Sequence, residues 1–383
     1  MTWRLSCCGV PIRHNNREWG IKMKVAVLIS GGVDSSVALQ LLKNQGHDVT
    51  AFYLKIWLED ELSYLGDCPW EQDLAFVRQV CEQLEVPLEV VSLQKEYKDE
   101  VVAHTVAEVK AGRTPNPDIL CNQRIKFGLF LDKIDPSFEK VASGHYAQVR
   151  EKDGIVELFQ SPDPIKDQTY FLSHLSQKQL QRVMFPIGHL QKSELRVLAH
   201  EFNLPNKDRK DSQGICFLGK FKFADFIKHH LGTQKGQMIE SETGKVMGNH
   251  DGFWFYTIGQ RQGLGLGGGP WYVVAKDTDK NIVYISRNYY DDEKQRDTFF
   301  VENIHWLSDR HCNKKNLLVK LRHGAHLYQC VIDYEESGKA KVQLCSRDQG
   351  IAAGQYAVFY DNDVCLGSGV ISNYCAQVSE SGF

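Results

Sequence analysis

The fold is decided by residues Lys24–Val37, which read KVAVLISGGVDSSV. The apolar run Val25–Ile29 is short and continuous, which is typical of a strand buried on both faces of a parallel sheet. Ser30–Gly32 interrupts the run, and apolar residues then recur at helical spacing until Gly46. The stretch therefore predicts a strand, a glycine turn and a helix, in that order.

The glycine turn has the properties of an anion-binding site. Gly31 and Gly32 let the backbone approach a ligand without interference from a Cβ atom. The exposed N–H groups and the positive end of the following helix favour phosphate. The spacing matches neither G-x-x-x-x-G-K-[ST] nor G-x-G-x-x-G, and the alternative is a turn that merely joins strand to helix.

A second glycine-rich segment, Gly263–Gly268, does match G-x-G-x-x-G. Pro270 and the strand-like residues WYVV follow it, where a dinucleotide site requires a helix. We therefore expect a flexible loop in this segment.

The composition is that of an ordinary globular protein with room for two or three domains in its 383 residues. Hydrophobic residues make up 42% and charged residues 24%, and no apolar stretch approaches the roughly 18 residues that a membrane span needs. The net charge of −3 argues against a basic coat, so any RNA binding must come from local patches.

The cysteines favour a reducing compartment. The chain has 11 cysteines, an odd number, and no C-x-x-C pair. This pattern does not resemble a secreted disulfide framework, and it also counts against a zinc or iron–sulfur site of the usual spacing. We expect no structural metal.

The order of the predicted elements indicates a multidomain α/β protein. From Lys24 onward strands and helices alternate, which predicts a doubly wound parallel sheet with ligands at the carboxyl ends of its strands. After Asp297 the pattern changes to six short strands, typical of a small barrel or sandwich, and we expect a barrel. We expect four segments: a leader or upstream extension (1–22), a catalytic domain (23–218), a small α+β, β-rich middle domain (219–296) and a C-terminal β-barrel (297–375).

The first of these segments has two interpretations. It is rich in arginine and precedes Met23, so it is either an organellar presequence or extra residues upstream of a true start. Its scarcity of serine favours the second interpretation. We therefore expect a cytoplasmic protein, with an organellar location as the alternative.

Two further stretches present a cysteine in a polar loop. In GRTPNPDILCNQRIKF, two prolines stiffen the chain ahead of Cys121, and the start of the next helix favours a thiolate there. In NKDRKDSQGICFLG, three cations precede Cys216 and also favour the thiolate. The alternatives are a buried filler cysteine and an incidental surface cysteine. A disulfide between them requires Cα atoms within about 7 Å.

Six motifs occur together in one order: SGGVDSS, PNPDILCNQRIKF, the triplet Gly144–Tyr146, KDQTYFL, DSQGICF and TIGQRQGLG. Together they resemble the tRNA-specific 2-thiouridylases, or tRNA-uridine 2-sulfurtransferases, which contain the ATP-pyrophosphatase loop SGGxDS. The resemblance runs from about Met23 to Asn373 and implies an ATP-pyrophosphatase fold for the first domain.

The resemblance implies roles for individual residues. The ATP-binding set would be Ser30, Gly31, Gly32, Val33, Asp34, Ser35, Ser36, Leu54 and Gly144. The tRNA-binding set would be Asn116, Pro117, Asp118, His145, Lys166, Asp167, Gln168, Arg322, His323 and Gln355. The catalytic set would be Cys121, Cys216 and Asp118, with a transient disulfide between Cys121 and Cys216. The family often has alternating Arg and Tyr where this chain has Leu321–Gly324, so the chain departs from the family pattern at His323.

The implied reaction is 2-thiolation of the wobble uridine of tRNA. Mg2+-bound ATP would adenylate the C2 oxygen, and a persulfide on Cys216 would supply sulfur, either directly or as hydrosulfide released by Cys121. Asp118 would act as general acid or base, and the base would be flipped out of its stack. The partners implied are tRNA and a persulfide-carrying sulfur donor protein, with no membrane.

Three other classes of function remain as alternatives. An amide-forming ligase would keep the ATP loop but usually adds a glutaminase domain, for which this chain has no room. A binding or sulfur-carrier protein without catalysis would leave the glycine loop idle. A purely structural α/β protein would leave both cysteine loops unexplained.

Overall fold

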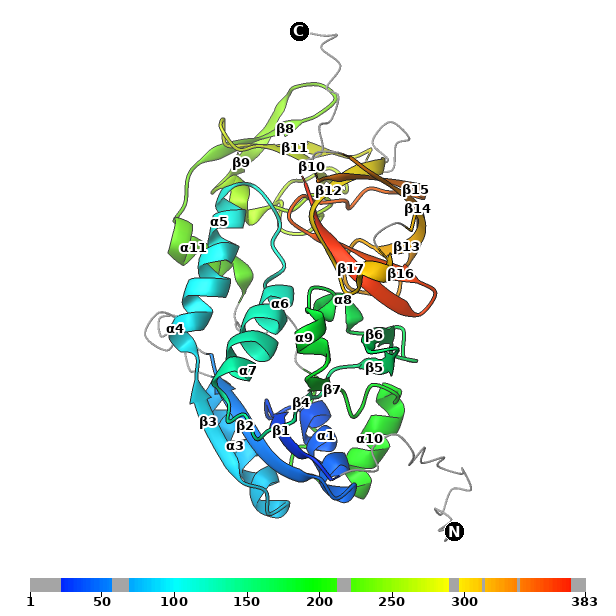
Figure 1. The fold of residues 1–383 in the computed structure, drawn as a ribbon. Coiled ribbons are helices and arrows are strands. Elements are labelled where there is room, and N and C mark those ends of the chain that lie inside the picture. Colours follow the sequence, from blue (N-terminus) through cyan, green and yellow to red (C-terminus); the bar gives the residue numbers. More distant parts are fainter. Residues whose placement is uncertain are drawn as a thin grey trace.

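The computed structural model describes residues 22–56, 69–211, 222–288, 296–311, 314–335 and 338–372. Three β-sheets organise these residues (Figure 1). A parallel sheet lies at one end of the molecule, and a small mixed sheet and a barrel lie at the other. None of the helices in the described residues is long and apolar enough to cross a bilayer.

The first sheet is parallel and has five strands in the order β3-β2-β1-β4-β7. Its strands are β1 (Lys24–Leu28), β2 (Asp48–Lys55), β3 (Leu88–Ser92), β4 (Lys140–Ser143) and β7 (Val183–Met184). β1 is central, and its alternate residues enter two different apolar cores, one on each face of the sheet. The predicted doubly wound parallel sheet with a central glycine-loop strand is confirmed.

Helices connect the strands of this sheet and continue beyond its last strand. They are α1 (Val33–Asn44), α3 (Pro69–Gln83), α4 (Gln94–Tyr97), η2 (Lys98–Val102), α5 (Ala103–Lys110), α6 (Pro117–Leu120), η3 (Cys121–Leu129), α7 (Phe130–Lys133), α8 (Thr169–Leu172), α9 (Gln177–Leu180) and α10 (Lys192–Glu201). α4, η2 and α5 run on from one another, and Figure 1 shows them extending from the parallel sheet towards the middle domain.

The middle domain is a four-stranded sheet in the order β10-β11-β8-β9. Its elements are α11 (Phe223–Leu231), β8 (Gly236–Glu240), β9 (Val246–His250), η4 (Phe253–Phe255), β10 (Tyr272–Asp277) and β11 (Ile282–Ser286). Gly263–Gly268 lies in the loop between η4 and β10, followed by a strand. No helix follows the glycines, so the expectation of a loop is confirmed.

The last six strands close into a barrel, as predicted. They are β12 (Arg296–Trp306), β13 (Asn316–Lys320), β14 (Tyr328–Tyr334), β15 (Ala340–Asp348), β16 (Tyr356–Asp361) and β17 (Val364–Ile371), with the short turn η6 (Asp309–His311) after β12. Pairing of β12 with both β15 and β17 closes the ring. A hairpin of β5 (Ala147–Lys152) and β6 (Ile155–Gln160) joins the same sheet through β6 and β17.

A buried ion pair joins the barrel to the catalytic domain. Lys320 Nζ on β13 lies 2.7 Å from Asp167 Oδ2, and the two side chains are 1% and 0% exposed. The Asp167 carboxylate also accepts hydrogen bonds from Gln160 Nε2, the Ser161 N–H and the Thr169 hydroxyl. Buried charges need such partners, because desolvation costs several kcal/mol per ion.

We predict that Lys320→Met lowers the free energy of unfolding by about 3–5 kcal/mol, because Asp167 would stay buried without its cation. Urea titration of the full-length protein measures this change. Lys314→Met is the matched control, because it breaks the Lys314–Asp361 pair whose side chains are 41% and 42% exposed. The control should change stability by no more than about 1 kcal/mol. Equal effects of the two variants would contradict the role assigned to the buried pair.

Candidate active site

The loop after β1 is folded by its own hydroxyl groups. The Ser35 and Ser36 hydroxyls donate to the Gly32 carbonyl at 3.0 and 3.1 Å, and the Ser30 N–H donates to Ser35 Oγ at 3.2 Å. Gly31 has φ of +78°, a conformation that side chains rarely adopt, and a Cβ there would lie 2.7 Å from the Asp73 carbonyl oxygen. The loop is therefore a tight cradle at the start of α1, where an anion fits best.

The other residues expected around ATP lie at the same edge of the sheet. Leu54 is near the carboxyl end of β2, and Gly144 directly follows β4; both strands flank β1. A Cβ on Gly144 would lie 2.7 Å from the Ser35 nitrogen, so β4 and the first turn of α1 touch backbone to backbone. The structure thus brings Ser30–Ser36, Leu54 and Gly144 together.

The segment that leads towards Cys216 packs against this loop. The Asn206 side-chain amide donates to the Gly31 carbonyl at 2.8 Å, and Arg209 donates to the same carbonyl at 3.0 Å. Arg209 also pairs with Asp73. The Arg209 guanidinium therefore stabilises the conformation of the glycine loop. Cys216 itself lies outside the described residues.

Charged residues continue from the glycine loop to Asp211. The Asp34 carboxylate accepts hydrogen bonds from the Tyr146 hydroxyl at 3.1 Å and from Lys192 Nζ at 2.7 Å. Asp211 pairs with Lys192, Lys166 and Arg196 at 2.8, 2.7 and 2.5 Å. Burial alone would raise the pKa of Asp211, but hydrogen bonds from Lys166 and Lys192 lower it to about 2.

Cys121 lies in a helix that begins earlier than the sequence pattern indicated. Asn116 is its N-cap and accepts a hydrogen bond from the Ile119 N–H at 3.3 Å, and Pro117 takes the first helical position. Asp118 lies in the first turn, and Cys121 follows at the end of α6 with 1% exposure. Asn116, Pro117, Asp118 and Cys121 therefore all lie in the first turns of one continuous helix.

From Cys121 the helix adopts the wider π-helical winding of η3. Gln179 donates through its side-chain amide to the carbonyls of Gln123 and Phe127, both at 2.7 Å. A Cβ on Gly128 would lie 2.7 Å from the Gln123 carbonyl oxygen. π-helical turns are frequent at functional sites, and here Gln179 satisfies carbonyls that the altered winding exposes.

The expected tRNA-binding triplet lies beside the glycine loop. Gln168 accepts a hydrogen bond from the Tyr146 N–H at 3.0 Å and donates its own N–H to the Tyr146 carbonyl at 2.8 Å. Lys166 pairs with Asp211, whereas the Asp167 side chain is buried against Lys320. His145 hydrogen-bonds Ser143 at 2.7 Å, and burial together with Lys126 lowers its pKa well below the usual value. Burial therefore favours the neutral form of the His145 imidazole.

The barrel residues of the expected site meet the catalytic domain at two points. Gln355 donates to the carbonyls of Thr114 and Pro115 at 3.0 and 3.2 Å, directly before Asn116. His323 hydrogen-bonds the Asp167 carbonyl at 3.1 Å. Both residues thus hold the interface between the two domains.

Arg322 is arranged differently from these two residues. It pairs with Asp348 within the barrel and is 52% exposed. It donates hydrogen bonds to Asp348 and to the Gly350 carbonyl, which both belong to the barrel, whereas Gln355 and His323 bond to the catalytic domain.

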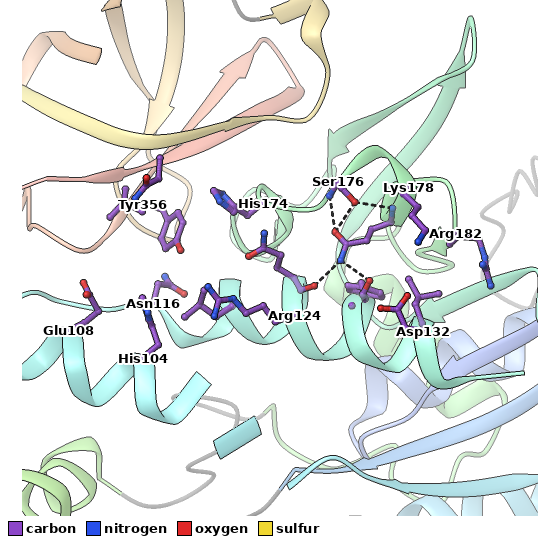
Figure 2. A pocket seen from close by; sticks show the side chains of 18 of the residues that line it. His104, Glu108, Asn116, Arg124, Asp132, His174, Ser176, Lys178, Arg182 and Tyr356 are labelled. Carbon is purple, nitrogen blue, oxygen red and sulfur yellow. Dashed lines mark hydrogen bonds between the residues drawn. The ribbon is translucent and has the colours of Figure 1, made fainter. Parts of the chain in front are cut away.

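A polar groove of about 1070 Å³ runs beside the helix formed by α6 and η3, between the catalytic domain and the barrel (Figure 2). His104 and Glu108 on α5, Asn116, Arg124 on η3 and Tyr356 on β16 line it. Burial lowers the pKa of His174, which also lines the groove, to about 4. Both domains therefore shape the approach to Asn116.

Sequence reasoning missed three side chains that organise this region. Lys192 and Lys320 each reach a carboxylate on a distant element, and Gln179 reaches the carbonyls of η3. Their positions follow from tertiary packing, for which the local sequence carries no signal. The described residues include no group of three or more His, Cys, Asp or Glu side chains placed to hold a metal ion.

We predict that Gly144→Ala weakens ATP binding by about 10-fold or more, because a displaced first turn of α1 would lose at least one hydrogen bond to a charged phosphate, worth about 1.5–3 kcal/mol. The new methyl group would push the start of α1 out of place. Equilibrium titration with Mg-ATP measures the change. Gly267→Ala is the control, because a Cβ there meets nothing within 4 Å. Unchanged ATP affinity in Gly144→Ala would refute the placement of ATP at this edge.

Comparison with protein families matches the whole described fold. Residues 23–220 match the tRNA methyl transferase HUP domain, residues 224–287 the tRNA methyl transferase PRC-barrel domain, and residues 296–371 the aminomethyltransferase beta-barrel domain. The first of these models covers more than half of the chain.

Relatives that match nearly the whole chain carry a different name from these family models. The chain is 45% identical over 355 residues to the tRNA-specific 2-thiouridylase MnmA of Parabacteroides distasonis, covering 91% of this chain and 99% of the relative. The corresponding protein of Porphyromonas gingivalis is 45% identical over 360 residues, with the same coverage of both chains. MnmA 1 of Bacteroides thetaiotaomicron is 43% identical over 356 residues, 91% of this chain and 100% of the relative. Because these matches span nearly the complete chain, they decide between the two names: the chain belongs to the tRNA-specific 2-thiouridylase family.

Proposed function

We propose that this protein is a tRNA-uridine 2-sulfurtransferase that replaces the C2 oxygen of the wobble uridine with sulfur at the expense of ATP. The observation that carries the proposal is the position of Tyr146. Its hydroxyl bonds Asp34 in the glycine loop, and its backbone bonds Gln168 in the expected tRNA-binding triplet. Family membership supports the same assignment.

ATP activates the oxygen that must leave. The C2 oxygen of uridine is a poor leaving group, so it attacks the α-phosphorus of ATP and pyrophosphate departs. The N–H groups at the start of α1 stabilise charge on the phosphates. Asp34 is the carboxylate in this loop that suits Mg2+, which would neutralise part of the phosphate charge.

Sulfur then displaces AMP. The terminal sulfur of a Cys216 persulfide attacks C2, AMP leaves with the original oxygen, and Cys121 attacks the Cys216 sulfur to free the product. In the alternative order, Cys121 first attacks the persulfide and releases hydrosulfide, which attacks C2. Both orders end with a Cys121–Cys216 disulfide that an external thiol must reduce.

Other residues position the base. Asn116, Pro117 and Asp118 meet the flipped uridine at the rigid helix start, and Asp118 transfers protons. We place the tRNA against the interface that Gln355 and His323 hold, with Lys166, Gln168, His145 and Arg322 as further contacts. Asp167 contributes to this surface through its ion pair and backbone, because its side chain is buried.

We also propose a persulfide-carrying protein as sulfur donor and a cytoplasmic location. Cysteines of the described residues support a reducing compartment, since Cys81, Cys330, Cys345 and Cys365 are free thiols.

The experiment is a thiolation assay with unmodified tRNA, Mg-ATP and a persulfide donor, followed by mass spectrometry of the digested RNA. We predict 2-thiouridine with the natural protein and a loss of about 1,000-fold or more in Cys121→Ser and Cys216→Ser, as for other essential nucleophiles. Cys345→Ser is the control, because Cys345 is an exposed thiol on the barrel.

Two results would contradict the proposal. Pyrophosphate release without 2-thiouridine would retain the ATP chemistry but require another acceptor, such as the carboxylate of an amide-forming ligase. Absence of both products would leave a binding or carrier role.

A further inference from the structure

Lys192 is brought to the glycine loop by the packing of α10 on α1. Val33 and Val37 of α1 share an apolar cluster with Leu195 and Ala199 of α10. Lys192 is the first residue of α10, and its N–H donates to the Asp163 carboxylate at 3.0 Å. The long side chain therefore starts from a fixed backbone and reaches the first turn of α1.

The Lys192 ammonium lies between two carboxylates. Its Nζ is 2.7 Å from Asp34 Oδ1 and 2.8 Å from Asp211 Oδ1, and its side chain is 15% exposed. It also lies 5.8 Å from the centre of the Tyr146 ring. Charge interactions at such a partly buried position are stronger than on an open surface.

Three cations and three carboxylates make up this cluster. Lys192, Lys166 and Arg196 pair with Asp34 and Asp211, and the Asp163 carboxylate accepts the N–H groups of Lys166 and Lys192. The Lys192 ammonium is bound to Asp34 in the first turn of α1, whose N–H groups themselves favour anions. A phosphate chain bound in the glycine loop would therefore meet a cation that is already in place.

We propose that Lys192 is a further ligand of the ATP phosphate chain. Its ion pairs with Asp34 and Asp211 hold the ammonium in position before ATP binds. An ammonium has three donors, so Lys192 can turn towards a phosphate oxygen while it keeps its bond to Asp211. Asp34 is then released from Lys192. The inference rests on the proposed use of ATP and adds a residue that belongs to none of the six motifs.

Asp211 acts in this scheme as a positioning residue. It binds Lys192 at 2.8 Å and also binds Lys166 and Arg196. Asp211→Asn removes the charge but keeps a side chain of the same size. This variant should raise the KM for ATP less than loss of Lys192 does, and the change in KM should exceed the change in kcat.

The test compares Lys192→Met, Lys192→Arg and Lys235→Met in the full-length protein. Lys235→Met is the matched control, because it removes the cation of an exposed ion pair with Asp251 in the middle domain. We expect Lys192→Met to weaken Mg-ATP binding about 10- to 100-fold without tRNA, as loss of a charge-assisted hydrogen bond does. Lys192→Arg should restore most of the affinity, and the KM for tRNA should stay within about 3-fold.

A measurement on the natural protein covers the case in which Lys192→Met does not fold. Acetic anhydride labels lysines, and mass spectrometry reports each site. Addition of Mg-ATP should reduce labelling of Lys192 several-fold and leave Lys235 unchanged.

Different results would contradict the inference about Lys192 and the proposed function. Unchanged ATP affinity in folded Lys192→Met, or unchanged labelling of Lys192, would overturn the inference even if 2-thiouridine is formed. Normal ATP binding that depends on Lys192, without 2-thiouridine, would overturn the proposed function alone.

Discussion

The arrangement of the site depends on one buried ion pair, Lys320 with Asp167. It joins the barrel to the segment that carries the expected tRNA contacts, and both side chains are withdrawn from water. The cost of burying two charges is offset only by close pairing and by the extra hydrogen bonds of the Asp167 carboxylate. Because the pair fixes the barrel, Gln355 can support the loop before Asn116. A barrel far away in sequence thereby supports the loop before Asn116 in the candidate site.

Local sequence patterns were sufficient for much of the fold. The apolar run Val25–Ile29 and the glycines after it identified the central strand and its loop, because burial on both faces and phosphate binding each impose a local residue pattern. The six short strands after Asp297 were found for a similar reason, since each is bounded by turn residues. Family motifs then identified the expected site residues. The structure places those expected to bind ATP at the carboxyl edge of the parallel sheet.

Two other features have a local sequence signal that was not used, and two more are seen in the structure alone. Asp153-Gly154 between two alternating runs is a hairpin signal that predicts β5 and β6, and Asn116-Pro117-Asp118 is a capping signal that places the helix start. Lys192 and Lys320 carry no such signal. Each acts across more than a hundred residues of sequence, on Asp34 and Asp167, so only tertiary packing reveals it.

The central claim is that ATP activates the C2 oxygen of the target uridine at the glycine loop. The most direct measurement uses tRNA whose wobble uridine carries a heavy oxygen isotope at C2, in a single turnover with ATP and a persulfide donor. The account predicts that the heavy oxygen appears in AMP, because the bond between oxygen and the α-phosphorus survives when C2 takes up sulfur. Heavy oxygen released as water, with unlabelled AMP, would contradict it.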